Sequence, residues 1–69
     1  MTDWEKIKAK LKTEEQLLAE GWSLHTTCDH LIGAGPLTKL LNRDNPDLEF
    51  DIVAGDIDWG VKIMSRSKE

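Results

Sequence analysis

The chain has little of several features that would point directly to a function. Its 69 residues include a single cysteine, which excludes an intramolecular disulfide and favours a reducing compartment. No apolar run approaches the roughly 18 residues that a bilayer-spanning segment needs. The start of the sequence also lacks the apolar region of a secretory signal. We therefore expect a cytoplasmic protein that makes no contact with a membrane.

Positive charge is also in short supply. Thirteen Asp and Glu residues stand against nine Lys and Arg residues, which gives a net charge of −4. Direct nucleic-acid binding depends on clustered Lys and Arg, so we do not expect it here. The chain is long enough for one domain, and a domain this short buries only about 60% of its unfolded surface. A partner protein or a second copy of the chain, as a homo-oligomer, would help to stabilise it.

What is present is dominated by residues 48–64, which alternate like a β-hairpin. A two-residue turn at Gly55 and Asp56 fixes the register, since loop length determines strand pairing, and it gives Gly55 a positive φ. One face of the hairpin is then apolar in every pair. The pairs are Ala54 with Ile57, Ile52 with Trp59, Phe50 with Val61, and Leu48 with Ile63. The opposite face is expected to be solvated and acidic.

The first twenty residues predict a helix that breaks near Lys12 and Thr13. One capping box begins at Thr2, and a second, formed by Thr13 and Gln16, indicates a new helical start. Gly21 is placed to end the second piece. The apolar positions of the first piece, at helical spacing, are Trp4, Ile7 and Leu11.

The middle of the chain predicts a strand followed by a short helix. Residues 22–28 alternate and are rich in Thr and Trp, which favours a strand. Residues 33–36, Gly-Ala-Gly-Pro, are typical of a break, with Pro36 as the first position of a helix that ends near Asn42.

These elements predict the α+β class. We expect a two-layer fold with the N-terminal helix, broken near Thr13, packed on a small three-stranded antiparallel sheet that includes the C-terminal hairpin. The third strand would lie between the other two and leave one sheet face open. The alternative places the first strand beside the second in parallel. We expect residues 1–64 to form a single domain and residues 65–69 a polar, frayed tail.

His25, Cys28 and His30 are the candidates for metal binding or catalysis. A structural zinc site needs four converging ligands, and the sequence has no other His or Cys. Cys28 and His30 share a strand face and could form a nucleophilic pair, but the third group that would orient them is missing. We therefore expect no metal, no cofactor and no catalytic residue, and keep a small metal or Cys/His site as an alternative.

A second alternative is a site for a small anionic ligand or a nucleotide. Free amides at the start of the predicted helix could receive an anion, although Pro36 removes one of them. The spacing matches neither the Walker pattern nor the dinucleotide fingerprint. The residues of this candidate site are Gly33, Gly35, Thr38 and Lys39.

The main hypothesis concerns the acidic hairpin, where no Lys or Arg occurs from Asp44 to Val61. An acidic face can bind a basic protein surface, although such a face can also serve solubility alone. We expect a non-enzymatic interaction module, an inhibitor that covers the basic, nucleic-acid-binding surface of its target. In size and charge alone it resembles phage anti-restriction and anti-CRISPR proteins. The candidate contact residues are Asp47, Glu49, Asp51, Asp56 and Asp58.

Overall fold

The computed structural model describes residues 3–68 and shows a small sheet covered by three helices. The elements are α1 (Asp3–Lys8), α2 (Glu14–Ala19), β1 (Ser23–Cys28), α3 (Leu31–Asp44), β2 (Leu48–Ala54) and β3 (Val61–Ser67). The strands lie in the order β1-β3-β2, and both pairs are antiparallel. The α+β class and the central place of the third strand are thus confirmed.

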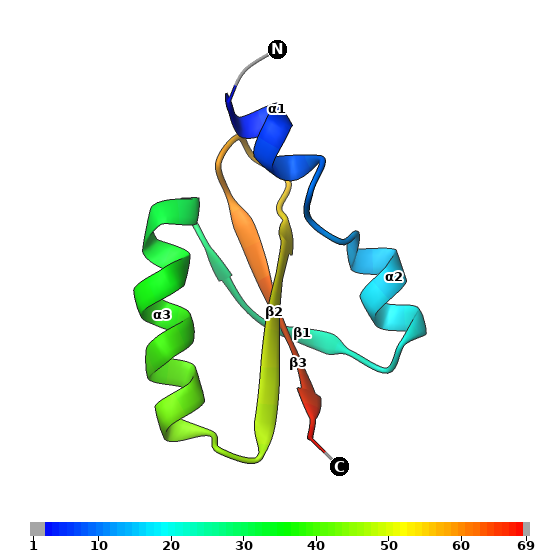
Figure 1. Cartoon of the computed structure of the whole chain (residues 1–69), viewed down its shortest axis with the longest axis vertical. Helices are drawn as coiled ribbons and strands as arrows, with labels where there is room; N and C mark the ends of the chain where they lie inside the picture. The colour runs from blue at the N-terminus through cyan, green and yellow to red at the C-terminus, as the bar shows by residue number, and fades with distance from the viewer. Residues whose placement is uncertain (1–2, 69) are drawn as a thin grey trace.

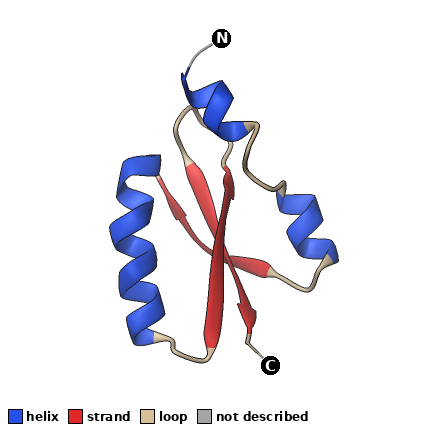
Figure 2. Cartoon of the chain, in the orientation of Figure 1, coloured by secondary structure: helices blue, strands red, loops and turns tan. Residues whose placement is uncertain are grey.

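Helices lie on both faces of the sheet, with α3 on one side and α2 on the other (Figures 1 and 2). On the α2 side, Leu17 and Trp22 pack with Val53 and Met64, all of them buried. The expectation of an open sheet face is therefore wrong for the part of the sheet that α2 covers. On the α3 side a second cluster is built on Trp4, Ala34 and Val61.

The predicted break between the first two helices explains how both faces become covered. Thr13 caps α2, since its Oγ1 accepts from the Gln16 amide at 3.1 Å and the Gln16 side chain accepts from the Thr13 amide at 3.1 Å. Lys12 forms a parallel bridge with Val53, so the chain passes the β2 edge between the helices. Because of this crossing, α1 and α2 pack on opposite faces. Gly21 follows α2 with a φ of 92°, as expected, and Thr2 lies outside the described residues.

The hairpin register differs from the prediction by four residues. Ile52 pairs with Ile63 rather than Trp59, and residues 55–60 form a loop in place of a two-residue turn. Gly55 is not among the residues with positive φ. An even shift keeps each strand residue on its predicted face, because strand side chains alternate with a period of two. β3 also continues through Ser65, a buried residue that was expected to fray.

A bulge in β1 changes which residues share a face. The register with β3 shifts between Leu24 and Thr26, so Leu24 lies beside Met64 whereas Thr26 lies beside Ile63. The strict alternation expected over residues 22–28 is therefore interrupted at His25. A bulge inserts one unpaired residue, so the strand residues before it point to the opposite sheet face from the one that strict alternation predicts.

The helix α3 begins earlier than the sequence predicts. His30 caps it, with Nδ1 accepting from the Ile32 amide at 3.1 Å, and Pro36 lies inside the helix. Pro36 offers no amide to the Ile32 carbonyl, which is tolerated because Ile32 is exposed and water can replace the donor. Gly33 approaches β1 so closely that a Cβ there would lie 3.2 Å from the Cys28 sulfur. This glycine therefore serves helix-to-sheet packing and does not break the helix.

Candidate protein-binding site

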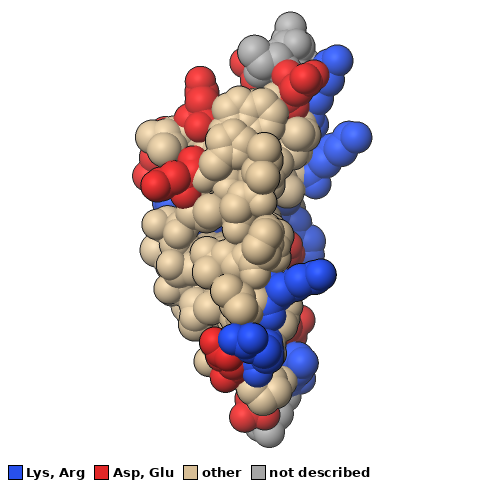
Figure 3. Space-filling model, turned by 90° about the vertical axis from the view of Figure 1, so that its left-hand side faces the viewer, with Lys and Arg blue, Asp and Glu red and all other residues tan. Residues whose placement is uncertain are grey.

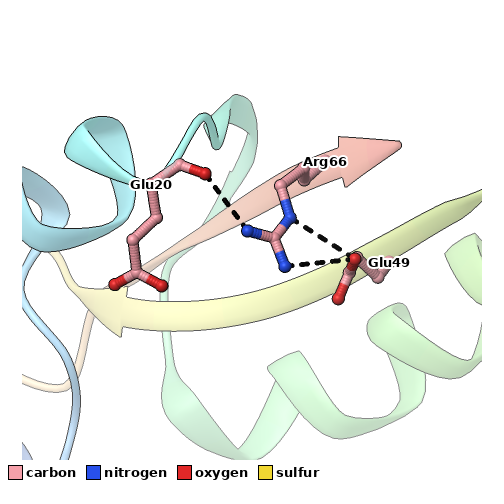
Figure 4. A network of polar contacts seen from close by, with 3 residues as sticks. All are labelled: Glu20, Glu49 and Arg66. Atoms are coloured by element: carbon pink, nitrogen blue, oxygen red, sulfur yellow. Dashed lines mark hydrogen bonds and ion pairs between the residues drawn. The ribbon is translucent and has the colours of Figure 1, made fainter. Parts of the chain in front are cut away.

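The carboxylates of β2 are engaged within the fold. Arg66 donates from Nη2 to Glu49 Oε2 at 3.3 Å and from Nη1 to the Glu20 carbonyl at 3.1 Å, which ties β3 to β2 and to the end of α2 (Figure 4). The same guanidinium lies 4.7 Å from the Trp22 ring centroid. Asp51 accepts from the Ile52 amide at 2.8 Å. Glu49 and Asp51 thus have structural partners on the face where a contact was expected.

The other three acidic candidates lie outside the strands. Asp47 is exposed before β2, and its carbonyl accepts from the Lys68 amide at 3.0 Å. Asp56 and Asp58 are exposed in the loop of residues 55–60, at the far end of β2. The five candidates therefore do not form one continuous face. Only Asp56 and Asp58, of these five, are exposed within the same loop.

The loop of residues 55–60, which we call the β2–β3 loop, is fixed by backbone hydrogen bonds. The Gly55 amide donates to the Gly60 carbonyl at 2.8 Å, and the Gly60 amide donates to the Ile57 carbonyl at 3.0 Å. The Leu31 amide donates to the Trp59 carbonyl at 2.7 Å, which joins the loop to the first turn of α3. Hydrogen bonds therefore join the two ends of the loop to each other and attach the loop to α3.

Trp59 adopts a conformation that its residue type rarely takes. Its φ is 65°, at the third position of the turn that the Ile57–Gly60 hydrogen bond closes. Glycine is the usual residue where φ is positive in such a turn, and a bulky residue there stores roughly 1–3 kcal/mol of strain. The indole lies between Trp4 and His30, with both centroid distances 5.3 Å and the imidazole parallel to within 1°. This packing stabilises the strained backbone.

Ile57 is the apolar residue that this arrangement presents. Ile57 is 61% exposed, and its side chain lies directly over Gly60. A Cβ at Gly60 would come 2.5 Å from Ile57 Cγ1, so only glycine leaves room for this placement. Asp56 and Asp58 flank Ile57 in the sequence and are both exposed. The loop tip is therefore an apolar side chain between two carboxylates.

A shallow hollow of about 200 Å³ lies beside Ile57. This is below the roughly 300–1,000 Å³ of a typical small-molecule site. Its charged residues are Asp29, Asp56 and Lys62, and Lys62 is also 3.3 Å from Glu14. The hollow has room for a single extended side chain, and its two carboxylates against one lysine favour a cationic one. The hollow is lined by Thr27, Cys28, Asp29, Gly55, Asp56, Ile57, Gly60, Val61 and Lys62.

The alternative anion site does not have the geometry that the sequence predicted. Gly33, Gly35, Thr38 and Lys39 all lie within α3, so no glycine loop precedes a helix start at Pro36. The true start has its first amides occupied, because those of Leu31, Ile32 and Gly33 donate to Trp59, His30 and His30. Thr38 donates to the Ala34 carbonyl at 2.6 Å, and Lys39 is exposed.

His25, Cys28 and His30 are placed for packing and capping. Cys28 donates through its sulfur to the His30 carbonyl at 3.1 Å, and the His30 ring caps α3 and stacks on Trp59. His25 contacts Phe50 edge-on at 5.1 Å. Within residues 3–68 no group of three His, Cys, Asp or Glu side chains is arranged to hold a metal ion.

Comparison with known proteins found no matching family model, no matching curated protein and no matching solved structure. Across residues 3–68, none of the helices has the length and hydropathy needed to cross a bilayer. The site therefore rests on geometry alone. Sequence reasoning placed Ile57 and Trp59 in a strand, because alternation continued through the loop. The available signal was the pair of glycines, Gly55 and Gly60, that bracket an Asp-Ile-Asp-Trp segment.

Proposed function

We propose that this protein is a non-enzymatic module that binds another protein through the β2–β3 loop. Ile57 is the apolar anchor, and Asp56 and Asp58 supply the flanking charge. The observation that carries the proposal is the strained backbone of Trp59 under the exposed Ile57. Strain of this kind persists where the surrounding structure enforces it and is concentrated at functional sites. A loop already fixed in its binding conformation also loses less conformational entropy on association.

The partner that fits this loop has an apolar pocket bordered by Lys or Arg side chains. Ile57 would enter the pocket, and one cationic side chain would enter the hollow beside Asp29 and Asp56. Basic surfaces of this kind are typical of proteins that bind nucleic acid. An inhibitor that covers such a surface in the cytoplasm remains our interpretation of the acidic composition. This interpretation now depends on the carboxylates of the β2–β3 loop, because Glu49 on β2 is already paired with Arg66.

The test compares two exposed aliphatic residues in capture from a host lysate. Ile57→Ser removes the proposed anchor, and Leu18→Ser, on α2 with 52% exposure, is the matched control. We expect Ile57→Ser to reduce retention of a specific protein roughly tenfold or more, as loss of an interface anchor does. Leu18→Ser should retain it, and a duplex DNA competitor should release it. Equal retention by both variants would show that the loop is not the contact.

A further inference from the structure

The two edges of the sheet differ in whether the rest of the chain occupies them. At the β2 edge, Lys12 bridges Val53, and the Ile52 amide donates to the Asp51 side chain at 2.8 Å. The β1 edge has neither feature: within residues 3–68, no backbone group of residues 23–28 forms a hydrogen bond outside the sheet. Most side chains of β1 are exposed as well. β1 therefore presents an open strand edge.

The pairing within the sheet determines which backbone groups of β1 are free. The Gly55 amide donates to the Gly60 carbonyl, and hydrogen-bonded pairs in an antiparallel ladder recur at every second residue. Lys62 therefore bonds toward β2, and its neighbours in β3 bond toward β1. Thr27 is the register partner of Lys62, so the Thr27 amide and carbonyl point away from β3, out of the edge. The bulge that precedes Thr26 confines regular pairing to the part of the edge after it.

The hollow beside the β2–β3 loop lies at the end of this open edge. Thr27, Cys28 and Asp29 line it, where β1 ends. Lys62 is engaged by Glu14 at 3.3 Å, whereas Asp29 has no ion pair within residues 3–68. In the upper half of Figure 3, acidic side chains lie along the left margin, and Lys and Arg side chains project from the right margin. Negative charge therefore borders the end of β1.

We propose that β1 receives an extended segment of the partner protein as a fourth, antiparallel strand, with a Lys or Arg side chain of that segment in the hollow. The inference rests on the proposed function in assigning this segment to the partner that the β2–β3 loop binds. An open edge selects an extended backbone over a helix, because only an extended backbone supplies matching donors and acceptors. Antiparallel pairing is slightly more stable than parallel pairing.

The antiparallel direction fixes where the cationic residue of the segment lies. Asp29 follows Thr27 by two positions, so the cationic residue precedes the residue opposite Thr27 by two positions. Strand residues two apart share a sheet face, which places the cationic side chain on the same face as the residue opposite Thr27. The carboxylates of Asp29 and Asp56 then select Lys or Arg at this position. The partner segment is therefore extended and carries its cation toward its N-terminal end.

Synthetic peptides test the strand pairing directly on the native chain. The probe is an acetylated and amidated hexapeptide that begins with arginine and continues with alternating valine and threonine. Amide chemical shifts of the isotope-labelled protein should change at Thr27 and its neighbours and should saturate. N-methylation of the third peptide residue, whose amide faces β1, should weaken binding roughly tenfold or more. N-methylation of the fourth, whose amide faces solvent, should leave binding nearly unchanged. Equal loss with both peptides, or no saturable change at β1 up to millimolar peptide, overturns the proposal.

A second comparison tests the position of the cation. The native chain should bind the probe about threefold or more tightly than a hexapeptide that begins with glutamine. Asp29→Asn should remove this preference. Asp47→Asn is the matched control, since Asp47 is also exposed but does not line the hollow, and it should keep the preference. A preference that survives Asp29→Asn would show that the cation does not enter the hollow.

The same probe separates this inference from the proposed function. Excess hexapeptide should displace the captured partner from the native protein, and a partner retained at saturating peptide would overturn the assignment of the segment to that partner. If Ile57→Ser loses the partner while the hexapeptide fails to bind, the loop is the contact and strand pairing at β1 is wrong. If the hexapeptide binds with the expected methylation pattern while Ile57→Ser captures normally, β1 pairs with extended segments and the loop proposal fails.

Discussion

Acidic residues serve two different purposes in the two halves of the hairpin. On β2, Glu49 and Asp51 bond to Arg66 and to the backbone of Ile52, and Glu49 is partly buried. In the β2–β3 loop, Asp56 and Asp58 are exposed on either side of Ile57. The strands thus use carboxylates to hold the fold, whereas the loop directs them outward. Changes in the strands should therefore alter stability, and changes in the loop should alter binding.

The largest effect is expected in the strands, at Met64. Met64 is fully buried between Leu17, Trp22 and Val53 under α2. Met64→Ala should lower the free energy of unfolding by about 2–5 kcal/mol, because it leaves a cavity. Urea denaturation measures this. The control is Leu24→Ala, at its register partner on β1, which is half exposed and should cost clearly less. Equal costs would show that α2 does not cover this face tightly.

Met64 also illustrates what could be predicted from the sequence. The alternation of β2 and β3 assigned the correct faces even though the register was four residues out, since the error was even. The cover over Met64 was missed because the break at Thr13 was predicted without its consequence, namely that α1 and α2 separate to opposite faces. The place of Pro36 inside α3 and the bulge in β1 at His25 were not predicted, because tertiary packing overrode local sequence preferences at both positions. Gly55 and Gly60 could have indicated a loop, but its conformation could not be predicted, since nothing local indicates that Trp59 takes a positive φ.

A smaller effect on stability, and a larger one on binding, is expected at Gly60. Gly60→Ala places a Cβ against Ile57 Cγ1, so Ile57 must move. Overpacking of this kind costs about 1–3 kcal/mol. The displaced Ile57 should also weaken partner capture, measured beside thermal unfolding. Gly35→Ala is the control, because its Cβ would meet nothing within 4 Å. Normal capture by Gly60→Ala would mean that Ile57 need not be held in place.

The next smaller effect is expected at Arg66, which pairs with Glu49 on the neighbouring strand. Arg66→Ala removes the contact with the Trp22 ring and leaves Glu49 without this partner. We expect a loss of about 1 kcal/mol, in line with partly exposed ion pairs and cation–π contacts. The loss should shrink in high salt as the ionic part is screened. Arg43→Ala, which breaks the exposed pair with Asp44, should change the melting temperature far less. Similar shifts for both would place Arg66 among ordinary surface charges.

The smallest effect on stability is expected from the loop carboxylates themselves. Asp56→Asn combined with Asp58→Asn keeps side-chain size and removes two charges. Asp56 is 3.7 Å from Lys62, but its side chain is 90% exposed and Lys62 keeps Glu14 at 3.3 Å. Stability should therefore change by less than about 0.5 kcal/mol, as is usual for surface substitutions. Rim charges steer association, so the double variant should bind its captured partner more slowly and with a weaker dependence on salt.

Glu49→Gln is the control on the strand and should have the opposite effects. Because Glu49 pairs with Arg66, this substitution should lower stability and leave the association rate nearly unchanged. If Glu49→Gln slowed association as much as the loop variant, the acidic strand face would be part of the contact, and the division between strands that hold and a loop that binds would fail.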